Sequence, residues 1–419
     1  MNRKQLVILL VLLVVVGGAG LLLRQKQSRS YQDANPAMGT KLLGDLPVNN
    51  VAHISIKQGG SELNLVKKGD LWRVRERADY PANYTEISDL LLKLRELKIV
   101  QTEKVGASQL PRLALVPGEG TNSALVLDLK DQNQKPVKTM LLGKKHMKKG
   151  DRRASPYGDM GDQGWPDGRY VKVATDSDTV AVISDPLANV EPKPEQWLNK
   201  DFFKIEKPRS IAVNFPNATN SWKLERETEA GEWKLVDVKP GEQLDNGKAS
   251  GVANPLSSAS FADVASSSKP EELDKATVAT IETFDQITYT LKVGQKTNDN
   301  YPLAMTVAAQ LPKERPPGKD EKPEDKDKLD KEFKEKNTKL EEKLAQEKPL
   351  EKWVYLVSSW TVDPLLKERA QLMVEKKEEP KDGTKDAAGE IPGLQPLPPP
   401  VGEAAPPPPA PAPDPKPNP

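Results

Sequence analysis

The chain has no cysteine and only two histidines, His53 and His146, among its 419 residues. The first absence excludes disulfides, thiolate catalysis and cysteine-ligated zinc, and leaves the redox compartment open. His53 lies on the more polar side of an expected strand, so we expect it at the surface, and we expect His146 in a loop. No GxSxG elbow, HExxH pair or phosphate loop with a lysine is present. The prediction is a protein that is not an enzyme and holds no cofactor or metal.

The chain also has almost no net charge, because it contains 62 basic and 61 acidic residues. A chain this close to neutral has no global field to attract nucleic acid, which is therefore not an expected partner. Aromatic residues make up only 5% of the chain, whereas 29% of residues are charged and 38 are proline. We therefore expect part of the chain to form no core.

One long apolar run stands out against this composition, from Leu6 to Leu23. Such a helix is about 27 Å long, close to the hydrocarbon thickness of a bilayer, so we expect a transmembrane helix after a tail of residues 1–5. A cleavable signal peptide ending near Gly18 and Gly20 is the alternative. The positive charges on the two sides of this helix are nearly balanced, so they do not set its orientation in the membrane. Because long domains translocate largely regardless of charge, we expect the long C-terminal part to lie outside.

After an expected linker over 24–46, residues 47–207 form the first predicted α+β module. Alternation on both sides of Gly59 and Gly60 predicts a hairpin, and Leu71 to Val74 predicts a third strand. The spacing of Ile87, Leu90, Leu91, Leu94 and Leu97 predicts a helix with Thr85 as its N-cap. Further strands are expected at 124–129 and 139–142, the second closing at Gly143.

The same order of elements recurs over residues 208–375. Gly231 to Leu235 repeats the glycine, tryptophan, base, aliphatic pattern of Gly69 to Val74, and Asp363 to Leu365 repeats Asp185 to Leu187. Trp353 to Val357 is expected in the place of Tyr170 to Val173. A weaker helix broken at Asn254-Pro255 completes the second copy. The predicted fold is α+β, with two tandem similar modules of antiparallel strands packed with a helix; chance similarity is the alternative.

Two segments depart from the repeat. In residues 313–352, 26 of 40 residues are charged, which predicts a solvated arm with a short helix ending near Pro349. Its thin apolar seam keeps a weak coiled coil open as the alternative. Residues 376–419 are predicted to be a disordered tail, and 14 of the last 29 residues are proline. That tail is either solvated or a spacer or ligand for a proline-binding groove.

A basic cluster is the one candidate binding site. A loop there could bind a phosphate, a lipid headgroup or an acidic partner, although a solvated hairpin end explains the charges as well. Its residues are Lys144, Lys145, Lys148, Lys149, Arg152 and Arg153. The run Gly158 to Gly164 lacks the alternating carboxylates and the terminal glutamate of a calcium loop, and no strand and helix bracket it as a dinucleotide loop requires. Seven tryptophans are expected mainly in the core, with carbohydrate stacking as the alternative. They are Trp72, Trp165, Trp197, Trp222, Trp233, Trp353 and Trp360.

Several blocks carry a family resemblance: GKKHM at 143–147, WPDGRY at 165–170, SDPL at 184–187 and EPKPEQWLNKDFF at 191–203. In these blocks, the chain resembles the bacterial domain-of-unknown-function family 4340. The resemblance implies a single-pass protein of the bacterial inner membrane with its C-terminal part in the periplasm, often encoded beside gliding-motility-type ABC transporters. That family has no assigned catalytic or binding residues, so none is carried over.

The leading hypothesis is a non-catalytic, membrane-anchored envelope protein that serves as an accessory or scaffold subunit of such a transporter complex. Its partners would be membrane proteins of that complex, reached through Leu6 to Leu23. A cell-wall or polysaccharide binder is the alternative, and a hydrolase a more distant one. Oligomeric state stays open.

Overall fold

A computed structural model describes residues 38–120, 122–148, 165–173, 179–266, 273–316 and 322–375. The predicted transmembrane helix Leu6 to Leu23 and the predicted tail 376–419 lie outside these ranges. Within them, no helix is both long enough and apolar enough to cross a bilayer.

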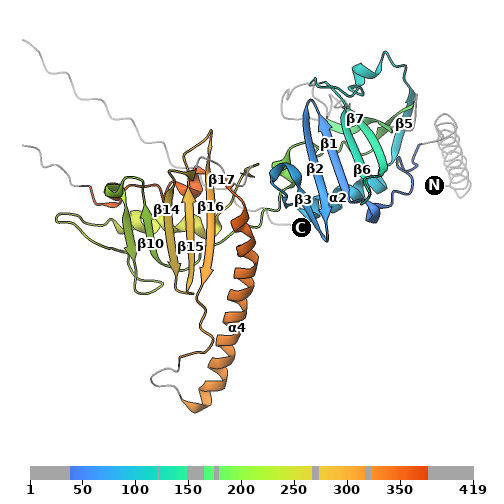
Figure 1. The fold of residues 1–419 in the computed structure, drawn as a ribbon. Coiled ribbons are helices and arrows are strands. Elements are labelled where there is room, and N and C mark those ends of the chain that lie inside the picture. The colour runs from blue at the N-terminus through green and yellow to red at the C-terminus, as the bar shows by residue number, and fades with distance from the viewer. Residues whose placement is uncertain are drawn as a thin grey trace, which may run out of the picture. The chain divides into compact units, whose positions relative to one another are not determined.

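The first half of the described chain forms a nine-stranded sheet in the order β4-β3-β2-β1-β6-β7-β8-β9-β5, and its paired strands are antiparallel (Figure 1). The predicted hairpin is confirmed as β1 and β2, and Gly59 and Gly60 adopt the left-handed backbone that its turn requires. The strands are β1 (His53–Gln58), β2 (Ser61–Lys68), β3 (Leu71–Val74), β4 (Tyr80–Pro81), β5 (Ile99–Lys104), β6 (Leu125–Lys130), β7 (Pro136–Lys148), β8 (Trp165–Val173) and β9 (Thr179–Ile183).

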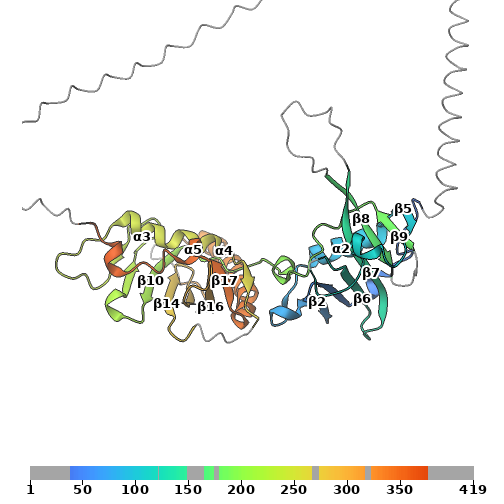
Figure 2. The ribbon, with the colours of Figure 1, turned by 90° about the horizontal axis from the view of Figure 1, so that it is seen from above.

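Helix α2 (Tyr84–Glu96) covers one face of this sheet, as Figure 2 shows. Its predicted apolar face is confirmed, since Ile87, Leu90, Leu91 and Leu94 are all buried. The predicted N-cap is wrong. Asn83 caps the helix instead, because its side-chain oxygen accepts hydrogen bonds from the backbone N–H groups two and three residues later.

Strand β7 is longer than predicted, because Gly143 does not close it. The pairing of β7 with β8 shifts register between Leu142 and Lys145, so Gly143 sits in a bulge and the strand continues to Lys148. A Cβ at Gly143 would collide with the backbone oxygen of Leu113. The glycine therefore permits close approach of two backbones rather than ending the strand.

The second half forms an eight-stranded antiparallel sheet in the order β12-β11-β10-β14-β15-β16-β17-β13. Helices α3 (Asn246–Ala253) and α5 (Ser359–Val362) lie on one face of it (Figure 2). The strands are β10 (Pro208–Asn214), β11 (Trp222–Glu225), β12 (Lys234–Leu235), β13 (Asp263–Val264), β14 (Thr277–Thr283), β15 (Ile287–Val293), β16 (Asn300–Ala309) and β17 (Tyr355–Ser358).

The two sheets have the same strand order once β10, β11, β12, β14, β15, β16, β17 and β13 are matched to β1, β2, β3, β6, β7, β8, β9 and β5. Only β4 has no counterpart among the described strands. One predicted equivalence is wrong: Trp353 to Val357 leads into β17, which takes the place of β9, whereas β16 takes the place of β8. The α+β class with two antiparallel sheets is confirmed.

The charged insertion holds a long helix, α4 (Pro323–Glu347), that extends beyond the end of the second sheet (Figure 1). Its length of 25 residues exceeds the short helix predicted from the sequence. Leu340 and Leu344 pack against the core, and Glu347 is buried. The Glu347 carboxylate accepts hydrogen bonds from the Tyr289 hydroxyl at 2.7 Å and from the Lys204 backbone N–H at 3.1 Å. The arm is therefore docked at its C-terminal end and not solvated throughout.

Part of the predicted linker 24–46 also belongs to the folded structure. Leu43 and Leu46 are buried in the core, at 2% and 3% exposure. The backbone N–H of Gly39 donates to the carbonyl of Ile99, and that of Leu42 donates to the carbonyl of Leu97. The described chain therefore joins the first module from about residue 39 onward.

Candidate functional site

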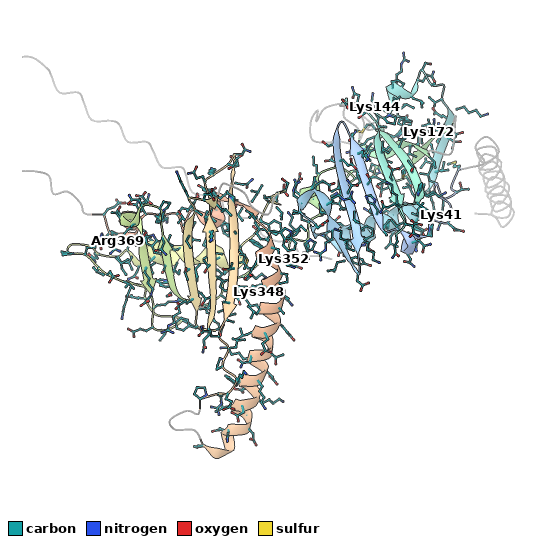
Figure 3. All side chains as sticks on the ribbon, viewed as in Figure 1. Lys41, Lys144, Lys172, Lys348, Lys352 and Arg369 are labelled. Carbon is teal, nitrogen blue, oxygen red and sulfur yellow. The ribbon has the colours of Figure 1, made fainter. Side chains whose placement is uncertain are left out.

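The predicted basic cluster is only partly described. Lys144 and Lys145 are exposed on β7, and Figure 3 shows Lys144 at the surface of the first sheet. Lys148 is the last residue of β7, whereas Lys149, Arg152 and Arg153 lie outside the described residues. Lys193 lowers the pKa of Glu191, and the charge of Lys145 lowers it further. Part of the positive charge of the cluster is thus already balanced by a carboxylate.

His146 lies in β7 and not in a loop, which corrects the sequence-based expectation. Its Nδ1 is 2.6 Å from a carboxylate oxygen of Asp167, and its ring meets that of Tyr170 edge to face. A carboxylate orients the histidine of hydrolase triads in this way, but a triad also needs a nucleophile bonded to the other nitrogen. Among the described residues, Asp167 is the hydrogen-bond partner of this ring and no hydroxyl bonds to it.

His53 is buried, at 4% exposure, so the prediction that it lies at the surface is wrong. Its Nε2 is 2.8 Å from the side-chain oxygen of Asn64, and its Nδ1 is 2.9 Å from that of Gln134. The amide nitrogen of Asn64 donates to both Glu62 and Glu76. These partners cover the ring from β2 and from the turn before β7, which is why a polar strand face is buried here.

The tryptophans are mostly core residues, as predicted. Trp360 is the exception, at 59% exposure in α5, and the side chain of Trp165 lies outside the described part. The buried ones are Trp72, Trp197, Trp222, Trp233 and Trp353. Buried rings present no open face for stacking on a sugar, so these five do not form a carbohydrate platform.

Trp72 and Trp233 nevertheless each line a cavity. The cavity at Trp72 has a volume of about 370 Å³ and lies between β3, helix α2 and the short helix η1 (Val48–Asn50). Trp72, Ile87 and Leu91 form its apolar lining, and Tyr84 and Leu92 stand at its rim with 67% and 41% exposure. Lys67 is the one charged residue among its described lining residues. We name this cavity the Trp72 groove.

The cavity at Trp233, of about 390 Å³, is the corresponding place in the second module. Its lining is charged, with Glu206, Lys207 and Glu229 around the tryptophan. The Arg226 guanidinium lies 4.7 Å from the centre of the Trp233 ring and donates to the carbonyls of Pro208 and Glu229. Burial lowers the pKa of Arg226.

Strand register makes the two cavities equivalent position by position. Ile54, Leu65 and Val74 form one cross-strand row in the first sheet, and Ile211, Leu224 and Leu235 form the same row in the second. Two residues beyond that row lie Lys67, in β2, and Arg226, directly after the end of β11. Each module therefore has a tryptophan with a base beside it, and the surroundings are apolar in the first module and charged in the second.

Sequence reasoning found the two tryptophans through the repeated pattern but missed the bases beside them. The signal was present, since Lys67 and Arg226 each lie two residues after an aliphatic residue of the paired strand. What was missing was the register that brings each base opposite its tryptophan. Within the described ranges, no cluster of histidine and carboxylate side chains has the geometry of a metal site.

Fold and site together define a tandem α+β arrangement with one cavity at the same place in each module. Residues 72–277, just under half of the chain, match the family model "Domain of unknown function (DUF4340)". The predicted resemblance to this family is thereby confirmed, and the matched region runs from β3 of the first sheet to the start of β14 in the second. Neither a curated protein nor a solved structure matches the chain.

Proposed function

We propose that the protein is a non-catalytic, membrane-anchored scaffold that serves as an accessory subunit of an ABC-transporter complex of the bacterial envelope. The observation that carries this proposal is the contact between its two modules. A scaffold holds partners at a fixed separation, and this needs modules that do not move independently. An inter-domain contact of polar residues alone permits such motion.

The contact has an ionic part and an apolar part. The Arg77 guanidinium makes two hydrogen bonds of 2.7 Å to the Asp263 carboxylate, and both side chains are about four-fifths buried. Bidentate arginine–carboxylate pairs fix orientation as well as distance. The indole N–H of Trp353 donates to the carbonyl of Ala78 at 3.0 Å.

Aromatic rings make up the apolar part. Tyr80 of the first module is 1% exposed and meets Phe261, Trp353 and Tyr355 of the second module edge to face, with centroids 4.9 to 6.0 Å apart. Burial raises the pKa of Tyr80 above its usual range. Because aromatic pairs contribute beyond their buried area, this cluster favours one arrangement of the modules.

The proposal is tested by purification of the full-length chain from native membranes in mild detergent after crosslinking. We expect transporter membrane subunits in the complex, and less of them when Leu6 to Leu23 is replaced by an unrelated spanning helix. A protein that emerges alone, or that sediments with isolated cell wall, would contradict the scaffold and favour the wall-binding alternative.

A further inference from the structure

The Trp72 groove is an apolar hollow with exposed apolar side chains at its rim. Tyr84, Ser88, Leu91 and Leu92 line it from consecutive turns of α2, so the groove runs along the helix. Tyr84 and Leu92 remain exposed at its rim. Exposed bulky apolar side chains around an apolar hollow are typical of protein interaction sites.

Its one charged lining residue is also free to act on a ligand. Lys67 is paired with Trp72 across β2 and β3, so both side chains are on the same side of the sheet. Within the described residues, no carboxylate lies within ion-pair distance of the Lys67 ammonium. Its neighbour Lys68, on the opposite side of the strand, is paired with Asp79 at 2.6 Å.

In the second module, the equivalent basic residue makes its contacts within the protein. Arg226, at the position equivalent to Lys67, lies over Trp233 and donates to two backbone carbonyls. Glu206 and Glu229 line the same cavity and supply negative charge beside it. The described lining of the first cavity contains no such carboxylate, so Lys67 has no acidic neighbour there.

We propose that the Trp72 groove binds a segment of a partner protein that places a bulky apolar side chain between Tyr84 and Leu92 at the rim of the groove and a neighbouring Asp or Glu on Lys67. The inference rests on the proposed scaffold function and identifies where the scaffold holds its partner. The carboxylate follows from the unpaired charge of Lys67, and the apolar anchor follows from the lining. Tyrosine and tryptophan are also the residues that most often dominate binding at protein interfaces.

The test uses the full-length chain in its native membranes with the photocrosslinking residue p-benzoylphenylalanine replacing Tyr84. The control carries it in place of Val238, which has a comparable exposure of 59% in the second module. We expect a protein adduct at position 84 well above that at 238. Mass spectrometry should identify the crosslinked peptide as an apolar segment with Asp or Glu within a few residues.

Charge substitutions in the same chain then test Lys67 itself. Lys67→Glu should lower the yield of the adduct by about tenfold, and Lys67→Arg should retain it, because a close charge pair across an interface contributes that much. Lys68→Glu is the matched control and should leave the yield unchanged. An adduct of lipid mass, a basic crosslinked segment, an adduct no stronger than at 238, or insensitivity to Lys67→Glu would each overturn the inference.

Co-purification from the same membranes separates this inference from the proposed function. If transporter subunits still co-purify while position 84 gives no adduct, the scaffold stands and the groove is not its contact. If no partner co-purifies, the scaffold proposal fails, and the adduct at position 84 decides about the groove independently.

Discussion

Among single residues, the two repeated tryptophans are expected to contribute strongly to stability. Trp72→Ala and Trp233→Ala should each lower the free energy of unfolding by about 3 to 5 kcal/mol, the range for large aromatic truncations in a core. Both rings are nearly inaccessible, at 6% and 5% exposure. Urea unfolding of the chain without Met1 to Ser30, followed by circular dichroism, measures the loss.

Trp360→Ala is the control for this pair, because Trp360 is 59% exposed and should cost little. If neither Trp72→Ala nor Trp233→Ala lowers the free energy of unfolding, the two rings are accessible in solution. The carbohydrate-stacking hypothesis would then gain support.

A second residue-scale prediction concerns acid stability. Arg369 and the backbone N–H of Lys239 hydrogen-bond to the Glu242 carboxylate and lower its pKa from 4.5 to about 2. Figure 3 shows Arg369 on the side of the second sheet away from α4. Because the folded state binds its proton less readily than the unfolded state, Glu242 stabilises the fold fully above pH 4.5, and this contribution is lost as the pH falls towards 2.

We therefore expect Glu242→Gln to unfold at lower urea concentration than the wild type at pH 6, with the difference shrinking between pH 4.5 and 2. Glu232→Gln, at an exposed carboxylate of the same module, should show no such trend. A difference that stays constant with pH would mean that the effect of Glu242→Gln does not come from its charge.

Among the elements, α4 is joined to the second sheet by the buried carboxylate of Glu347 and by the packing of Leu340 and Leu344. Glu347→Ala leaves the Tyr289 hydroxyl and the Lys204 N–H without their acceptor, and unsatisfied buried groups cost about 1–3 kcal/mol each. We expect lower stability of the second module and faster hydrogen exchange in the C-terminal half of α4. Glu342→Ala, at an exposed position of the same helix, is the control. Unchanged exchange in Glu347→Ala would show that Leu340 and Leu344 alone hold the arm.

In the whole molecule, the Arg77–Asp263 pair links residues 186 positions apart. Arg77→Asp or Asp263→Arg places like charges together, and each should cost about 2 kcal/mol, in the range for hydrogen bonds to charged groups. The double variant restores opposite charges and should recover most of that loss. Thermal unfolding of the chain without Met1 to Ser30 measures all three.

If the double variant is no more stable than either single variant, the two residues do not interact in solution and the rigid arrangement of the modules loses its ionic support. Lys41→Asp, which breaks an exposed pair with Glu96, is the control and should change stability by less than about 1 kcal/mol.

The features that the sequence itself determined are those encoded by local spacing. The alternation around Gly59 and Gly60 produces a hairpin because strand side chains point to alternate faces, and the three- and four-residue spacing from Ile87 to Leu94 produces α2 because a helix turns every 3.6 residues. The repeated tryptophan pattern in the same way predicted a second α+β copy, and matching strand orders support it.

Tertiary structure alone decided what depends on partners distant in the chain. His53 is buried because Asn64 and Gln134 supply its hydrogen bonds, which no strand pattern reveals. Lys67 lies beside Trp72 because the β2–β3 register places it there, and α4 is docked because Glu347 meets Tyr289. The physical reason is that burial and pairing are set by how surfaces pack, whereas local sequence sets only the conformation of each segment.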